Sequence, residues 1–420
     1  MPVHDEIRER AASDIAFVLP ARADDLTRLN TLVAGGEPVV TVIGKYNHGK
    51  SRLLNELIGE PTFAVADKRE TVVLADRVQR GMRWLDAPGL DADVGTEDDR
   101  YALHAAWLKS DIRLFVHAAK EGELDAMELA LLTELRDDGA RTQRQTVFVL
   151  SQVDQLADDA ELDYVSAAIG AQVPRFDLNP VSSTRYRNGI EGGKKLLVEK
   201  SGMHALVARL DAALAQVPVA RAHEIALLLG EIRDELQHLC AGRQRLLADL
   251  RDTRRQQREG FDNGLAAVMV KVSADIDAML NALGTDYAIV PDTAKDAYAI
   301  TAGKVERAHI QITYSRACIE IDGFLAGHGV VGLPSSQQTA ARSLNSVMIA
   351  VMGVSVKFRK DLRRMFCEAQ GRERMRREFT HYYELSDDCQ TLVAQIAEAN
   401  AALDATQCAL TALNTLEARA

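Results

Sequence analysis

Residues 44–51 read Gly44-Lys45-Tyr46-Asn47-His48-Gly49-Lys50-Ser51, with the spacing G-x-x-x-x-G-K-S. An apolar run at 38–43 precedes them, and apolar residues at helical spacing follow them: Leu53, Leu54, Leu57 and Ile58. Strand, glycine-rich loop and helix, in this order, let backbone N–H groups close around phosphates. Lys50 is then expected to reach the terminal phosphate oxygens and Ser51 to bind Mg²⁺. The sequence therefore predicts a nucleoside triphosphate site.

Length, charge and cysteine content exclude several other classes of protein. The 420 residues are enough for two or three domains, and the formal net charge of −11 argues against a general nucleic-acid binder. The five cysteines are odd in number and widely spaced, and they form no C-x-x-C pair, so neither a disulfide framework nor a zinc site is expected. No H-E-x-x-H spacing occurs. Mg²⁺ is therefore the one metal that the sequence predicts.

The termini and apolar segments predict a cytoplasmic location. The first residues are acidic and contain no apolar core of signal length. The most apolar segment, Val347 to Val356, is shorter than the ~20 residues that a membrane-spanning helix needs.

A second nucleotide contact follows the next strand pattern. Asp86-Ala87-Pro88-Gly89 matches D-x-P-G. A carboxylate at the end of a strand can hold Mg²⁺ through water, and the Gly89 amide can turn toward the γ-phosphate. Asp86 is therefore a predicted metal ligand, and Gly89 is a predicted catalytic residue.

Contacts to a purine base are predicted further along the chain. A buried strand pattern at 146–150 runs into Ser151-Gln152-Val153-Asp154, where GTPases carry [N/T]-K-x-D. Asp154 would accept two hydrogen bonds from guanine N1–H and the exocyclic amine, a donor pair that adenine does not offer. Ser182 and Ser183 stand where a short loop would present a backbone amide to guanine O6. GTP and GDP are the predicted ligands.

Residues 38–185 resemble a GTPase domain of the translation-factor-related class, and specifically its Era/TrmE and dynamin side. Asn47 matches the loop G-x-x-N-x-G-K-S of Era-type proteins, and 50–59, which includes Arg52, is similar to their G-K-S-x-L-x-N-x-L-x-G. The resemblance implies an α/β P-loop GTPase domain in which residues 44–52 surround the nucleotide. It also places Thr71 over Mg²⁺ and the γ-phosphate, with Thr62 as the competing candidate.

Gln152 departs from the family pattern. It replaces the usual lysine of N-K-x-D, whose side chain stacks on the base and braces the phosphate loop. Guanine preference is expected to survive through Asp154, with weaker affinity.

Leu90 stands where Ras-like proteins have a water-positioning glutamine. The resemblance to dynamins implies that Tyr46 and Asn47 act instead, with a held water and a cation, when two G domains dimerise. Asn47 is the stronger candidate, and simple aromatic packing is the alternative for Tyr46. His48 is expected to be a variable loop position that points outward.

The rest of the chain is predicted to be helical. The expected parts are an N-terminal helical extension at 1–35 with a break near Pro20, a GTPase domain at 36–217, and an elongated α-helical bundle at 218–420. Two apolar stripes predict coiled-coil or bundle seams between antiparallel helices: Ile225, Leu229, Ile232, Leu236, Leu239, Leu246 and Leu250, and Leu392, Ile396, Ala399, Leu403, Leu410 and Leu413. This arrangement resembles dynamin-like proteins in architecture.

The segment 323–377 is the predicted tip of that bundle. Before it, residues 309–322 alternate in a way that fits a short hairpin or an interrupted helix. Within it, the apolar run 347–356 precedes a basic cluster at 357–377, a combination that fits an anionic membrane surface. The alternative without a binding role is a buried helix with a solvated charged face. An RNA-facing patch is the third interpretation.

Together these patterns predict a GTP-binding protein that hydrolyses GTP with Mg²⁺. The predicted catalytic residues are Lys50, Asn47, Thr71 and Gly89, and the predicted metal ligands are Ser51, Thr71 and Asp86. One hypothesis is a dynamin-like protein that forms a homodimer or nucleotide-dependent oligomer through its G domain and binds membranes peripherally. The alternatives are an Era-like switch acting on a protein or ribonucleoprotein without membranes, and a nucleotide-binding scaffold with negligible hydrolysis.

Overall fold

The computed structural model describes residues 2–60, 75–79, 81–86, 107–174 and 176–418. It divides into two compact units. Unit 1 comprises Met1–His238 and Ala405–Ala420, and unit 2 comprises Leu239–Asp404. Unit 1 contains the predicted GTPase domain and N-terminal helices, and unit 2 contains most of the predicted bundle.

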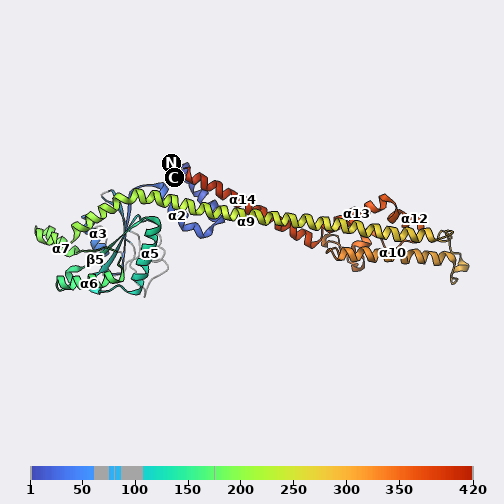
Figure 1. Cartoon of the computed structure of the whole chain (residues 1–420), viewed down its shortest axis with the longest axis horizontal. Helices are drawn as coiled ribbons and strands as arrows, with labels where there is room; N and C mark the ends of the chain where they lie inside the picture. The colour runs from blue at the N-terminus through green and yellow to red at the C-terminus, as the bar shows by residue number, and fades with distance from the viewer. Residues whose placement is uncertain (1, 61–74, 80, 87–106, 175, 419–420) are drawn as a thin grey trace. The chain divides into compact units, whose positions relative to one another are not determined.

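A six-stranded sheet forms the centre of unit 1 (Figure 1). Its strands lie in the order β2-β3-β1-β4-β5-β6, and only β2 runs antiparallel, against β3. Their bounds are β1 Val39–Ile43, β2 Ala75–Gln79, β3 Met82–Asp86, β4 Ile112–Ala118, β5 Gln145–Ser151 and β6 Leu178–Pro180. The carboxyl ends of the parallel strands share one edge, which is where ligands bind in open α/β sheets. The predicted mostly parallel α/β domain is confirmed.

Helices cover both faces of this sheet. On one face, α3 (Lys50–Ile58) and the first turns of α9 (Met203–Ala282) pack on β1, β4 and β5. On the other, α5 (Ala126–Thr142) and α6 (Asp159–Gln172) cover Phe115 and Phe148, which stack with ring centroids 5.2 Å apart. Two shorter helices, α7 (Ser183–Glu191) and α8 (Lys195–Glu199), follow β6. Burial on both faces explains why β1 is apolar at all positions except Thr41, and why even the polar residues of β4, Arg113 and His117, are buried.

The N-terminal segment is helical and breaks at Pro20, as predicted. Helix α1 (Pro2–Val18) and helix α2 (Ala23–Ala34) flank a 3₁₀ turn at Pro20–Arg22. The two helices bury Ile15, Leu26, Leu29 and Leu32.

Helix α9 has 80 residues and runs through Pro218 without a break, so the helix begins well before the predicted boundary at 217. Helix α14 (Asp387–Glu417) runs antiparallel to it. Arg233 pairs with Glu417 in unit 1, and in unit 2 Arg243 donates to the Ala402 carbonyl at 2.6 Å. One member of the predicted stripe is wrong: Leu246 is 53% exposed, and its neighbour Leu247 is buried in its place.

Among the described helices, α9 alone contains an 18-residue window apolar enough to cross a membrane by length and composition, with a mean hydropathy of 1.3. The sequence analysis expected no such segment. A third of this window is buried against the rest of the chain, and core helices of soluble proteins pass the same test.

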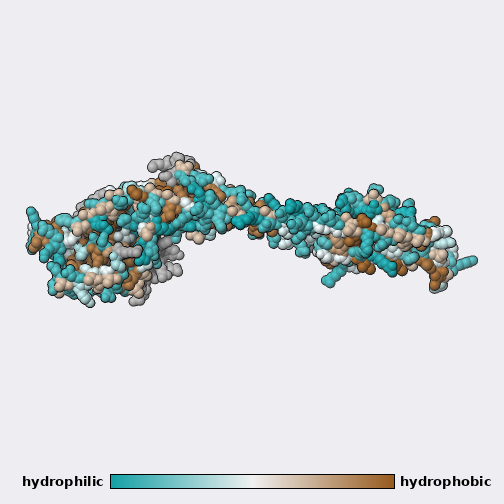
Figure 2. All heavy atoms as spheres, in the orientation of Figure 1, coloured by the Kyte–Doolittle hydropathy of each residue, from teal (hydrophilic) through white to brown (hydrophobic). Residues whose placement is uncertain are grey.

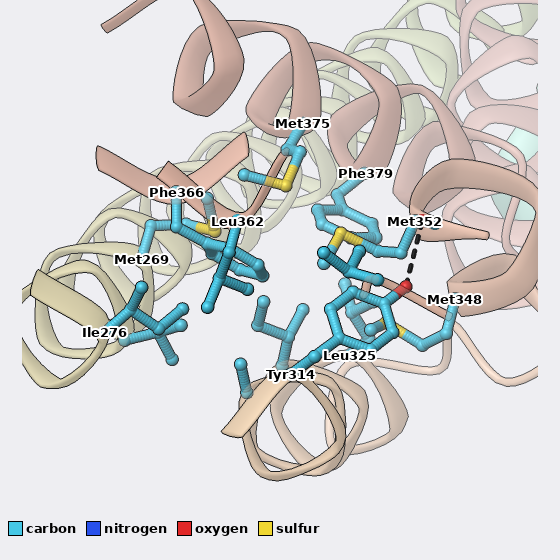
Figure 3. Close-up of a cluster of buried hydrophobic side chains, with 14 of the residues drawn as sticks. Met269, Ile276, Tyr314, Leu325, Met348, Met352, Leu362, Phe366, Met375 and Phe379 are labelled. Atoms are coloured by element: carbon cyan, nitrogen blue, oxygen red, sulfur yellow. Dashed lines mark hydrogen bonds between the residues drawn. The ribbon is translucent and has the colours of Figure 1, made fainter. Parts of the chain in front are cut away.

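Unit 2 has its own hydrophobic core. It is formed by the unit 2 part of α9 together with α10 (Ala302–Ala326), α11 (Val347–Met352), α12 (Arg359–Leu362), a π-helical turn at Arg363–Cys367 and α13 (Ala369–Glu384). Figure 3 shows Met269, Tyr314, Met348, Met375 and Phe379 converging in this core. The Tyr314 hydroxyl donates to the Met352 carbonyl at 2.9 Å.

Two predictions for unit 2 need correction. Residues 309–322 form neither a hairpin nor an interrupted helix, because they lie within the continuous helix α10. The apolar run 347–356 buries Val347, Met348, Met352 and Val356, so these side chains are not available to contact lipid. In the basic cluster, Arg359 and Arg372 hydrogen-bond to backbone carbonyls, whereas other members are exposed: Lys357, Lys360, Arg363, Arg364, Arg374, Arg376 and Arg377.

Candidate nucleotide-binding site

The loop after β1 is shaped to hold phosphates. Gly44 has φ +157°, and a Cβ added there would lie 2.2 Å from the Val116 carbonyl oxygen, so only glycine fits. Gly49 has φ +84° and immediately precedes α3. The Lys50 ammonium donates to the Gly44 and Lys45 carbonyls, each at 2.8 Å, and thereby closes the loop on itself. Backbone amides at this helix N-terminus form a ready anion site.

The predicted metal ligands Ser51 and Asp86 meet beside this loop. Ser51 Oγ donates to Asp86 Oδ2 at 2.9 Å. The second oxygen, Oδ1, is buried and has no hydrogen-bond partner among the described residues. Burial raises the pKa of the Asp86 carboxyl, while Ser51 and Lys50 oppose the rise. A hydroxyl beside a buried carboxylate with an unpaired oxygen is a donor set that suits Mg²⁺.

The predicted base-binding residues also lie together. Ser182 Oγ donates to Asp154 Oδ1 at 2.6 Å and accepts from the Arg185 amide at the start of α7. Val153 and Val181 are joined by a backbone hydrogen bond of 3.3 Å, which holds the two loops side by side. Asp154 is therefore fixed at the carboxyl edge of the sheet, and Ser183 begins α7 next to it.

Comparison with known proteins agrees with this geometry. A family model described as 50S ribosome-binding GTPase matches residues 39–152. The uncharacterized protein ACIAD1443 of Acinetobacter baylyi is 47% identical over 417 residues, which are 99% of this chain and 100% of that protein. GTPase Der of Thermoanaerobacter pseudethanolicus is 28% identical over 148 residues, 32% of each chain.

Residues 39–152 form a P-loop GTPase domain, and the chain as a whole belongs to the same family as the Acinetobacter baylyi protein.

Two solved structures show weaker likeness. Aquifex aeolicus Era bound to GDP and AlF4⁻ has 20% identity and a TM-score of 0.31, over 39% of this GTPase and 56% of Era. LeoA, a bacterial dynamin GTPase from ETEC, has 12% identity and a TM-score of 0.34, over 100% of this GTPase and 98% of LeoA. At these TM-scores neither likeness supports a conclusion.

Not all predicted site residues can be placed. Thr71, its competitor Thr62, Gly89 and Leu90 lie outside the described residues. Arg52 is exposed on α3, Tyr46 is half-buried, and Asn47 is exposed with a φ of 61°.

Gln152 braces the phosphate loop of this GTPase, contrary to the prediction that the brace is lost. Its backbone has φ 57°, and its Nε2 donates to the Asn47 carbonyl at 2.6 Å. The Gln152 amide also lies against Gly49, where an added Cβ would be 3.3 Å away. The glutamine thus keeps the contact to the loop that the usual lysine provides in the family.

We expect Gln152→Ala to weaken GTP binding about fivefold, because one hydrogen bond that positions the loop contributes about 1 kcal/mol. Gln152→Lys is the matched control. It restores the family residue and is expected to bind at least as tightly as wild type. Fluorescence titration with a labelled GTP analogue measures both variants. Equal affinity of wild type and Gln152→Ala would show that the brace has no role.

A buried polar cluster beneath the loop was missed by sequence analysis. His48 is not an outward loop position, because it is only 4% exposed and its Nδ1 lies 3.3 Å from the Val116 carbonyl. His117, at the end of β4, contacts Glu128 Oε1 through Nδ1 at 2.8 Å and the Gly122 carbonyl through Nε2 at 3.0 Å. Lys45 forms ion pairs with Asp125 and Glu128 at the start of α5. The cluster therefore ties the phosphate loop to α5.

Three groups of this cluster could in principle converge on a metal. Ligand atoms of His48, His117 and Glu128 all lie within 4.8 Å of one another. However, both ring nitrogens of His117 already face oxygen acceptors, and the capping box of α5 uses Glu128. The polar groups of the cluster have hydrogen-bond partners within the chain, so we assign no metal to it.

The environment of His48 predicts how the stability of the fold depends on pH. Burial, followed by the charges of His117 and Lys50, lowers the pKa of His48 to about 4, while Glu128 and the Val116 carbonyl oppose the shift. The unfolded chain, with an ordinary histidine pKa of 6.5, then binds the proton more readily than the folded chain. Lowering the pH from 6.5 toward 4 should therefore reduce the free energy of unfolding.

His48→Gln should remove this contribution, on the order of 1–2 kcal/mol between about pH 7 and about pH 5. Urea unfolding at both pH values measures it. The control is His204→Gln, which changes an exposed histidine on α9. The same pH dependence in wild type and His48→Gln would contradict the prediction.

A second cluster that sequence analysis missed joins the N-terminal helices and α9 to the sheet of unit 1. Arg28, in α2, is 3% exposed and binds Glu224 of α9 through Nε at 3.0 Å and Nη2 at 2.8 Å. It also donates to Asp111 at 3.2 Å and to the Leu108 carbonyl at 3.1 Å. Arg221 of α9 binds both oxygens of Asp111, at 3.0 and 2.6 Å. We call these residues the Arg28 network.

The Arg28 network lies directly before β4. Burial by itself would raise the pKa of Asp111, but hydrogen bonds from Arg221 and the charge of Arg28 hold that pKa below its ordinary value. Asp111 directly precedes β4, and Leu108 lies in the first described segment after Asp86. A cavity of about 380 Å³ borders the network, and its described lining includes Arg28 and Glu224 but no predicted nucleotide-binding residue.

Proposed function

We propose that this GTPase binds GTP with Mg²⁺ and hydrolyses it to GDP and phosphate. The proposal rests on the hydrogen bond between Ser51 and the half-buried Asp86, whose Oδ1 is buried, beside the loop that contains Lys50. Ser51 and Asp86 would hold Mg²⁺, together with Thr71, and the ion would neutralise phosphate charge when bound. Asp154, fixed by Ser182, would select guanine.

The proposed reaction is in-line attack of water on the γ-phosphate. Lys50 and the loop amides would stabilise the charge that develops on the phosphate oxygens. Asn47 is exposed at the loop, so its side chain would be accessible to a second G domain. Dimerisation of G domains would then raise the hydrolysis rate, as the resemblance to dynamins implies.

The nucleotide cycle would act on the helices through the Arg28 network. One arginine contacts α9, the residue before β4 and the Leu108 carbonyl. A shift of Leu108 or Asp111 would therefore change the hydrogen bonding of α2 and α9.

A second candidate is a regulatory switch that acts on a protein or ribonucleoprotein partner without binding membranes. One observation favours it over peripheral membrane binding: four apolar side chains of the run 347–356 are buried in unit 2, whereas Val354 is exposed. Sedimentation with anionic vesicles and a non-hydrolysable GTP analogue separates the two candidates. Nucleotide-dependent pelleting supports the membrane candidate, and its absence supports the switch.

Phosphate release at increasing protein concentration tests the proposed reaction. The specific rate of the wild type should rise with concentration if G domains dimerise, whereas Lys50→Ala should show no turnover above background. A wild-type rate equal to that of Lys50→Ala would indicate a nucleotide-binding scaffold instead.

A further inference from the structure

The connection between α9 and α10, residues 283–301, carries its large apolar side chains on the outside. Tyr298 and Ile300 are 102% and 89% exposed, the highest values for large apolar side chains in the described part of the chain. The small Ala288, in contrast, is buried. Figure 2 shows apolar side chains (brown) at the end of unit 2 where α9 and α10 are joined. We call the exposed set the end-loop cluster: Tyr287, Ile289, Val290, Tyr298 and Ile300.

Side chains at the start of α10 hold both arms of this loop. Arg307 Nη1 donates to the Val290 carbonyl at 3.2 Å. Lys304 Nζ donates to the Ala299 carbonyl at 3.0 Å. These backbone polar groups are thus paired toward α10, while the large apolar side chains remain in water. Apolar side chains gathered on one surface in this way mark a site of interaction.

The carboxylates of the loop are already engaged within the chain. Asp292 pairs with Arg307, and Asp286 lies 3.9 Å from Arg359. Asp296 accepts from the backbone at the start of its own 3₁₀ turn. The acidic groups beside the end-loop cluster therefore have partners, which leaves the charge that is available to a ligand to the basic residues.

Arg359 joins the basic cluster to this loop. It donates to the Gly284 and Thr285 carbonyls at 2.9 and 3.0 Å. Exposed cations consequently lie on either side of Arg359 in the sequence and on the loop itself. Among the described residues, no ion pair uses four of them: Lys295, Lys357, Lys360 and Arg363.

We propose that the end-loop cluster inserts into the headgroup region of an anionic membrane, with these four cations against the lipid phosphates. Tyrosine rings favour the membrane–water interface, and aliphatic side chains gain by leaving water at the acyl boundary. Lysine and arginine beside them are attracted to an anionic leaflet. A nucleic acid would satisfy the cations but would leave Ile289 and Ile300 in water, so a lipid surface fits both parts of the site.

This contact lies outside the apolar run 347–356, so the burial of that run does not oppose it. The inference concerns unit 2 alone. It requires neither GTP nor hydrolysis, and its test is therefore carried out without nucleotide.

Flotation of the 420-residue chain with phosphatidylcholine vesicles, with and without phosphatidylserine, tests the proposal. The wild type should float with the anionic vesicles and much less with the neutral ones. Tyr298→Ser/Ile300→Ser should lower the apparent partition coefficient about tenfold or more, because two large apolar side chains no longer leave water. The matched control is Val270→Ser/Ile319→Ser. These two side chains are 68% and 71% exposed elsewhere in unit 2, and the change should leave flotation unaltered.

Lys357→Ala/Lys360→Ala tests the charged part of the site. It should weaken binding to the anionic vesicles and leave the weak binding to neutral vesicles unchanged. Circular dichroism of every variant shows whether the helices remain folded, which these exposed substitutions should allow.

Three results would overturn the proposal. One is a wild type that floats with neither kind of vesicle, and another is equal flotation of Tyr298→Ser/Ile300→Ser and its control. The third is self-association of the wild type without vesicles that Tyr298→Ser/Ile300→Ser abolishes in sedimentation velocity, because the end-loop cluster would then join copies of the chain.

Discussion

Replacing Arg28 with alanine is expected to lower the free energy of unfolding of unit 1 by about 3–5 kcal/mol. The substitution leaves Glu224 and Asp111 buried, with Glu224 1% and Asp111 4% exposed. Arg28 supplies two hydrogen bonds to Glu224 and one to Asp111. Removing one partner of a buried ion pair costs far more than the pair itself contributes, because the remaining charge loses compensation. Among the described residues, Glu224 loses both hydrogen bonds from Arg28 and keeps only the ion pair with Arg144 at 3.4 Å, whereas Asp111 keeps Arg221.

Arg22→Ala is the matched control. Arg22 also joins the N-terminal helices to glutamates of α9, Glu231 and Glu235, but its side chain is 25% exposed. Exposed pairs contribute about 0–1 kcal/mol. Denaturation followed by tryptophan fluorescence reports on unit 1 alone, because Trp84 and Trp107 are the protein's two tryptophans and both lie there. Similar losses of unfolding free energy in the two variants would show that the buried Arg28 network stabilises unit 1 no more than the exposed pairs of Arg22 do.

Asp154→Asn is expected to change the base that this GTPase prefers. A carboxylate accepts from both N1–H and the amine of guanine, whereas an asparagine amide accepts one hydrogen bond and donates the other. Xanthine, which has a carbonyl in place of the amine, matches that pattern. With GTP, the variant loses one charge-assisted hydrogen bond, and its amide N–H₂ faces the guanine amine, so two donors oppose each other. Together these effects should cost about 3 kcal/mol, roughly a 100-fold loss of GTP affinity. XTP should bind better to the variant than to the wild type.

Ser182→Ala provides the comparison. It removes the hydroxyl that donates to Asp154 but leaves the carboxylate in place. GTP binding should weaken by less than tenfold, with no gain of XTP binding, since a single positioning hydrogen bond contributes about 1 kcal/mol. If Asp154→Asn retains wild-type preference for GTP, Asp154 does not contact the base.

The sequence predicted that residues 44–51, Asp86 and Asp154 meet at one edge of the sheet, because the signals for this arrangement are local. Gly44 and Gly49 mark backbone conformations that other residues rarely adopt, and Lys50 and Ser51 follow directly. Asp86 and Asp154 each stand at the end of a recognisable buried strand, and parallel strands bring such ends to one edge.

His48 and Arg28 could not be predicted in this way. His48 is buried because β4 brings His117 and the Val116 carbonyl beside the loop, 68 residues away along the chain. Arg28 sits among the apolar residues of α2 and finds Glu224 196 residues later. A charged residue within an apolar helix face was the available signal, but its partner depends on tertiary structure.

Helix α10 was misread for a different reason. Its core-facing and solvent-facing apolar residues together produce the alternation of a strand, and periodicity alone does not separate the two patterns. The exposed part of that pattern consists of Val305, Ile312 and Ile319.

Isothermal titration calorimetry of the wild-type chain with GTP, GDP and ATP, each with Mg²⁺, addresses the nucleotide assignment itself. GTP and GDP should each bind at one site per chain, and ATP should give no measurable heat of binding at the same concentrations. Equal binding of ATP, or no binding of either guanine nucleotide, would contradict the assignment of Lys50, Ser51, Asp86 and Asp154 to a GTP site.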